Sequence, residues 1–133
     1  MSAMRRKQVR PDELPHTRSP IKYLTENGFS IVRASEIDPS VTDSPSECHF
    51  LVQHDDKAER EIRVSFGEEL IAHLWIRRRI PLSETSMFWL VCAEDCLANY
   101  LWERDQYPPD DQLKINELPP EQLMLALHWR DRD

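Results

Sequence analysis

SETSMFWLVCAEDCLANYLWERD, residues 83–105, decides the fold of this 133-residue chain, because it contains neither glycine nor proline and is strongly apolar. Its apolar side chains recur at the i, i+3, i+4 and i+7 spacing of one helical face: Trp89, Cys92, Ala93, Cys96, Leu97, Tyr100 and Leu101. Glu94 falls on the opposite, polar side. Phe88, Leu90 and Val91 widen the apolar surface at the start, so we expect that part to be covered all round by the sheet and neighbouring helices, or by another subunit. The pattern predicts a long central helix with Ser83 as its N-cap.

The segments before this helix predict a β-hairpin preceded by a short helix and a further strand. Residues 60–66 alternate apolar and polar side chains, and five polar residues join them to a second β-rich run at 48–54. Residues 29–37 are rich in strand-forming side chains and are separated from the hairpin by a turn-rich gap. Ser19 as N-cap and Gly28 as C-cap predict a short helix before them.

Two further helices and a strand complete the pattern. The helix before the central one has a single apolar face, formed by Leu70, Ile71, Leu74 and Trp75. Pro81 ends that helix, Leu113 and Ile115 alternate with polar neighbours as a strand, and Pro119 with Pro120 opens a last helix. The predicted order is α-β-β-β-α-α-β-α. We therefore expect an α+β fold, with a small, three- to four-stranded, mainly antiparallel sheet and helices packed on one face.

Length and charge indicate one acidic domain with a basic terminus. The net charge is −7, but five basic and two acidic side chains give residues 1–19 a charge of +3, which leaves −10 on residues 20–133. We expect residues 1–19 to be a disordered basic arm and residues 20–133 a single domain. No apolar run approaches the ~18 residues of a membrane span, and none follows the N-terminal arginines as in a secretory signal. The expectation is a cytoplasmic protein that does not engage membranes.

The residues capable of chemistry form no recognised catalytic or metal signature. With only two glycines, the chain cannot build a glycine-rich phosphate loop. Cys92 and Cys96 are one helical turn apart, and Cys48 makes the number odd, so we expect reduced core thiols. Acid–base groups are available on three histidines: His49, His54 and His73. Because no spacing aligns them with a nucleophile, we expect no catalytic residues, no metal and no cofactor.

Two groups of side chains remain as candidate contact sites. Trp102 lies off the main helical face and Trp129 lies near the chain end, and exposed tryptophans are enriched at interfaces. The leading hypothesis is a protein-interaction or accessory domain that associates with itself or with a partner subunit through these two tryptophans. Arg77, Arg78 and Arg79 define one alternative, a nucleic-acid-associated regulator that binds phosphates with these cations and the basic arm. A small enzyme with a histidine and carboxylate pocket is the other alternative.

Overall fold

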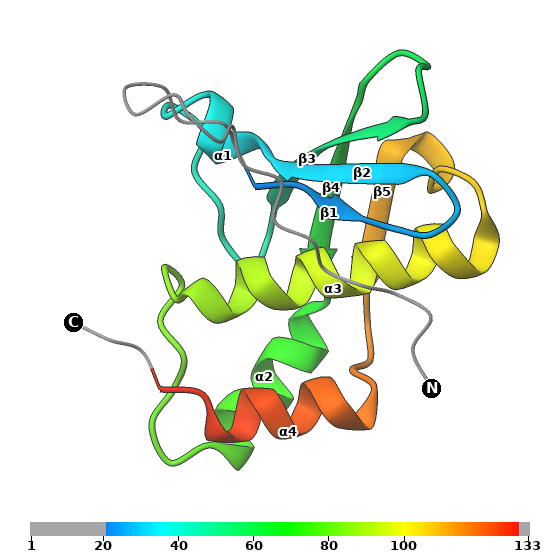
Figure 1. The fold of residues 1–133 in the computed structure, drawn as a ribbon. Coiled ribbons are helices and arrows are strands. Elements are labelled where there is room, and N and C mark those ends of the chain that lie inside the picture. Colours follow the sequence, from blue (N-terminus) through cyan, green and yellow to red (C-terminus); the bar gives the residue numbers. More distant parts are fainter. Residues whose placement is uncertain (1–20, 131–133) are drawn as a thin grey trace.

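The computed structural model describes residues 21–130 as an α+β fold built on one five-stranded sheet (Figure 1). The strands are β1 (Tyr23–Leu24), β2 (Phe29–Arg33), β3 (Cys48–His54), β4 (Arg60–Phe66) and β5 (Gln112–Ile115). The helices are α1 (Ala34–Ile37), α2 (Glu68–Arg77), α3 (Met87–Arg104) and α4 (Pro120–His128), with a 3-10 turn at Pro109–Asp111. The α+β class is confirmed. The expected sheet is corrected, because it has five strands and is mixed: β4 and β5 are parallel and the other neighbours antiparallel.

The first helix predicted from the sequence is wrong, because this part of the chain forms β1, which pairs antiparallel with β2. Gly28, expected to end a helix, lies in the turn between these strands with a φ of 99°. Glycine adopts this left-handed backbone without strain. A Cβ atom there would lie 2.7 Å from Asp55 Oδ1, so the turn also packs closely against the β3–β4 connection. The expected cap Ser19 and the predicted arm of residues 1–19 lie outside the described residues.

The central hairpin is confirmed with its predicted bounds. Strands β3 and β4 pair antiparallel, with Phe50 opposite Ile62. The strand predicted for residues 29–37 is shorter, because β2 ends at Arg33 and α1 follows it directly. Strand β5 forms where the alternation predicts it. It runs parallel to β4, because α2 and α3 carry the chain back before it re-enters the sheet.

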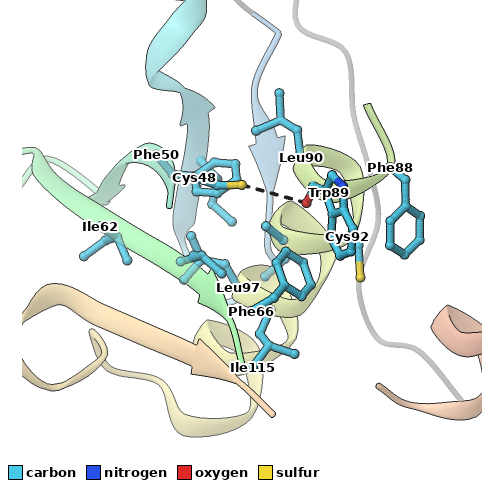
Figure 2. Packing of buried hydrophobic residues seen from close by; sticks show 14 of the residues in the cluster. Cys48, Phe50, Ile62, Phe66, Phe88, Trp89, Leu90, Cys92, Leu97 and Ile115 are labelled. Carbon is cyan, nitrogen blue, oxygen red and sulfur yellow. Dashed lines mark hydrogen bonds between the residues drawn. The ribbon is translucent and has the colours of Figure 1, made fainter. Parts of the chain in front are cut away.

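Alternation along the strands gives the sheet an apolar inner face and a mostly polar outer face. The inner side chains are buried: Phe29, Ile31, Cys48, Phe50, Val52, Ile62, Val64, Phe66 and Ile115. Helix α3 lies across this face (Figure 1). Its Trp89 ring meets the Phe66 ring edge-on, with centroids 5.0 Å apart (Figure 2). The predicted central helix therefore provides the cover of the sheet.

The start of α3 is organised by two serines. Ser86 is its N-cap, because the hydroxyl accepts a hydrogen bond from the backbone N–H of Phe88 at 3.1 Å. The sequence-based choice of Ser83 as cap is wrong by one turn. The carbonyl of Ser83 instead accepts the indole N–H of Trp89 at 2.8 Å, which satisfies the polar atom of a buried tryptophan. The loop before α3 is thereby tied to the helix that it introduces.

Helix α3 has a second buried side that faces away from the sheet. Phe88 is fully buried there, and its ring lies 5.7 Å from that of Trp129, just after α4. Leu90 is also buried, whereas Val91 is partly buried and Met87 is 50% exposed, so the start of this helix is covered on several sides but not all round. Helices α2 and α4 contact one another beyond α3, where α4 crosses α2 (Figure 1). The molecule is thus layered as sheet, α3, and then the α2–α4 pair.

A buried ion pair joins α3 to β2. Glu94, expected on the polar side of the helix, is only 2% exposed. Arg33 donates to its carboxylate from Nε at 3.2 Å and from Nη2 at 3.1 Å. A two-donor contact between guanidinium and carboxylate fixes the orientation of both groups as well as their separation. The pair therefore positions α3 on the sheet.

We expect Glu94→Ala to lower the free energy of unfolding by about 3 kcal/mol, because it leaves the Arg33 guanidinium largely buried without its carboxylate. The double variant Arg33→Met, Glu94→Leu removes both charges and should recover most of that loss. Urea unfolding followed by circular dichroism measures both values. Glu103→Ala, at an exposed position of α3, is the matched control with an expected change below about 0.5 kcal/mol. Equal losses for Glu94→Ala and the control would contradict the positioning role.

Candidate interaction surface

Helix α2 carries apolar side chains on two opposite faces. Leu70 and Leu74 are buried, whereas Trp75 is 50% and Ile76 is 82% exposed. Ala72, also exposed, precedes them by three and four residues, so the three form a stripe along the outer side of the helix. The prediction that Trp75 shares a single apolar face with Leu70 and Leu74 is therefore wrong. The i, i+3, i+4 spacing of Ala72, Trp75 and Ile76 marks the second stripe in the sequence but does not show which of the two faces is covered.

The chain beyond α2 extends this stripe. The helix ends at Arg77, because Arg78 adopts an extended backbone with φ −91° and ψ 143°. Ile80 follows and is 73% exposed. We call the cluster formed by Trp75, Ile76 and Ile80 the α2 apolar surface. Single exposed apolar residues are common on proteins, but three large ones within six consecutive residues make this part of the chain a candidate binding site.

The three consecutive arginines divide into two kinds. Arg78 Nε donates to the carbonyl of Ile80 at 2.7 Å, and its Nη1 donates to the carbonyls of Ala126 and Trp129, the latter at 3.1 Å. These two carbonyls lie at the C-terminal end of α4, where carbonyl groups lack intrahelical partners. Arg78 therefore joins the end of α2 to the end of α4 and holds the backbone of Ile80.

Arg77 and Arg79 flank this structural arginine and are both exposed. Within residues 21–130, neither side chain makes a hydrogen bond or an ion pair. Residues 70–83 contain all three arginines and no aspartate or glutamate, although the chain as a whole carries a net charge of −7. Two exposed carboxylates, Glu68 and Glu69, lie in the first turn of α2, so its positive charge is confined to the C-terminal end, next to Trp75, Ile76 and Ile80 in the chain.

Arg78→Ala should lower the free energy of unfolding by about 2 kcal/mol, because hydrogen bonds from a charged donor to the α4 carbonyls are lost. Arg77→Ala and Arg79→Ala are matched controls, for which we expect changes within about 0.5 kcal/mol. Urea unfolding measured side by side tests this difference. Similar losses for all three variants would show that the arginines do not differ in structural role.

The two tryptophans predicted as interface residues lie at opposite ends of α3. Trp129 is half-buried and packs on Phe88 in the first turn of the helix. Trp102 is half-buried near the other end of α3, about 20 Å further along at 1.5 Å per residue. The structure therefore does not bring Trp102 and Trp129 together into one surface. An interface role for either one stays a prediction.

The three cysteines are free thiols, and Cys48 and Cys92 are buried. The Cys48 thiol donates to the carbonyls of Ser44 at 3.3 Å and Trp89 at 4.0 Å (Figure 2). Burial, with a contribution from Asp43, raises the pKa of Cys48 to about 12. A hydrogen bond with Cys96, together with burial, also raises the pKa of Cys92. Both buried thiols are therefore protonated at neutral pH, and protonated thiols are poor nucleophiles and poor metal ligands.

The raised thiol pKa values predict a loss of stability at high pH. Below the ordinary thiol pKa of 9.0, Cys48 is neutral in both the folded and the unfolded chain. As the pH rises from 9.0 toward about 12, only the unfolded chain ionises there, so the unfolding free energy falls by up to roughly 1.4 kcal/mol per pH unit. Urea unfolding between pH 8 and pH 11 should therefore show a shallower decline for Cys48→Ala than for the wild type. Parallel curves would contradict this assignment.

The histidines lie on separate parts of the molecule. His49 is on the outer sheet face, where its Nδ1 is 3.1 Å from the Glu61 carboxylate. His54 Nε2 is 3.0 Å from the carbonyl oxygen of Asn27, and His73 is exposed on α2. Within the described residues, no group of three or more His, Cys, Asp or Glu side chains is arranged to hold a metal ion. The acid–base groups considered in the sequence are thus not brought together.

In comparisons with known proteins, no family model, no curated protein and no solved structure matches this chain. None of the helices within residues 21–130 combines the length and the hydropathy that a bilayer-spanning segment requires. The function therefore has to be inferred from the surface and the contacts described above.

Proposed function

We propose that this chain is a protein-interaction or accessory domain that binds its partner through the α2 apolar surface. The proposal is carried by the exposure of Ile76 and Ile80, at 82% and 73%. Burying one such side chain is favourable by about 1.5–3 kcal/mol, so a partner that covers both gains substantially. Trp75 and the two exposed arginines add the residue types that contribute most to binding energy at protein interfaces.

The backbone that presents this surface is already ordered. Leu70 and Leu74 anchor the inner side of α2 in the core, and Arg78 ties its end to α4. A surface that is fixed before binding loses little conformational entropy when a partner docks. The contacts of Arg78 also hold Ile80, which would otherwise sit in an unsupported bend before Pro81. These contacts support a binding role for the exposed side of α2.

Both forms of association expected from the sequence, with a second copy or with a partner subunit, fall within this role. The proposed contact surface differs from the pair Trp102 and Trp129. Those two tryptophans would require separate sites, whereas Trp75, Ile76 and Ile80 lie within six consecutive residues at the end of α2. An accessory subunit with a single docking surface is the simplest form of the proposal.

Site-specific photo-crosslinking in cells that naturally make the chain tests this function. A benzophenone amino acid in place of Ile76 should give adducts of discrete mass on illumination, because the partner contacts that side chain. The matched control is the same substitution at Ile37, which is 53% exposed on α1 outside the α2 apolar surface. Introducing Ile80→Asp should remove the adducts at position 76. Equal adduct yields at the two positions would contradict the proposal.

A further inference from the structure

We infer that the partner of the α2 apolar surface is an acidic amphipathic segment of another protein. Its apolar side chains would contact Trp75, Ile76 and Ile80, and its carboxylates would contact Arg77 and Arg79. This inference rests on the proposed function and specifies the chemistry of the partner at that same surface.

The two exposed arginines at the end of α2 favour an acidic partner. Arg77 and Arg79 are exposed and have no partner among residues 21–130, and the carboxylates of α2, Glu68 and Glu69, lie in its first turn at the opposite end of the helix. Guanidinium groups bind carboxylates through paired, charge-assisted hydrogen bonds. Since residues 20–133 together carry a charge of −10, an acidic partner is repelled by most of the remaining surface. The positive border therefore gives an acidic segment both a docking place and an orientation.

A second copy of this chain fits the same surface less well. A twofold interface places each residue near its own counterpart or near that counterpart's neighbours. About a twofold axis at Trp75, Ile76 and Ile80, Arg77 and Arg79 of the two copies approach one another, while Glu68 and Glu69 stay at the far end of α2. Like charges brought together at an interface are unfavourable by several kcal/mol. The charge pattern therefore favours a different protein over self-association at this site.

A nucleic acid also fits less well than a protein. Trp75 could stack on a base, but Ile76 and Ile80 are more exposed and present no π-face. Arg78 is already bound to the α4 carbonyls, which leaves two arginines for phosphates. Nucleic acid affinity comes mainly from many phosphate contacts, and an acidic chain opposes them. Large aliphatic side chains beside arginine and tryptophan instead match the composition of protein interfaces.

The dimensions of the surface limit the size of the partner segment. Helix α2 has 10 residues and is about 15 Å long. A partner helix laid along it would meet the stripe with apolar side chains at i, i+3 or i+4, and i+7. A segment of about ten to fourteen residues is therefore long enough to cover Trp75, Ile76 and Ile80.

Selection from a displayed peptide library tests the inference on the full chain. Each 14-residue peptide carries leucine or phenylalanine at i, i+3, i+4 and i+7, with Glu, Lys or Ser allowed at the flanking positions. Peptides that also bind the Ile76→Asp protein are discarded. We expect the retained peptides to be enriched in Glu, and synthetic copies to bind in fluorescence anisotropy. The variant Arg77→Glu, Arg79→Glu should weaken that binding by about tenfold or more and should select Lys-bearing peptides instead.

A charge-matched control separates local from overall charge. Lys57→Glu, Lys114→Glu changes the net charge by the same amount at exposed positions outside the α2 apolar surface and should leave peptide binding within about twofold. Retained peptides without a Glu preference would overturn the acidic partner but leave the proposed function standing. A dimer in sedimentation that Ile76→Asp abolishes would also overturn the acidic partner and leave the proposed function standing. An oligonucleotide complex that the Arg77→Glu, Arg79→Glu variant abolishes would overturn both, because the surface would then bind nucleic acid. Absence of any retained peptide would overturn the inference, and crosslinking at Ile76 then decides the proposed function separately.

Discussion

The position of α3 between the sheet and the α2–α4 pair is the constraint on which the rest of the structure depends. Glu94 fixes the helix to β2 through Arg33, and the Trp89 ring packs into the inner face of the sheet. The neighbouring residue Phe88 points to the other side and packs on Trp129. Adjacent residues of α3 thus pack against the sheet and against the end of α4. A displacement of α3 would therefore disturb both contacts together.

The binding surface is a consequence of this layering. Helices α2 and α4 lie beyond α3, so only one side of α2 can reach the core, and its second apolar stripe remains outside. Arg78 links the two outer helices by satisfying carbonyls that α4 cannot satisfy itself. The same side chain also donates to the carbonyl of Ile80. One residue therefore caps α4 and fixes the backbone of the α2 apolar surface.

Features that local pattern determines were predictable, and features set by distant partners were not. The alternation of β3 and β4 and the paired prolines before α4 were sufficient to place those elements. Strand β1 was missed because its pairing with β2, and not its own composition, decides its conformation. Glu94 was placed on the polar side because its partner Arg33 lies 61 residues away. The outer stripe through Trp75 was missed because periodicity shows which residues share a face but not which face is covered.

The chain order of the layers also determines what a ribosome exposes as it makes this protein. Strands β1 to β4 are complete at residue 66, whereas the helix that covers their inner face ends only at residue 104. At about 5–20 residues per second, translation needs roughly 2–8 s to supply the intervening segment. During that interval a sheet formed by β1 to β4 still lacks β5 at the edge of β4, and side chains such as Phe50 and Ile62 on its inner face lack the cover of α3. Nascent-chain chaperones that recognise extended apolar strands therefore have a defined window in which to act on this protein.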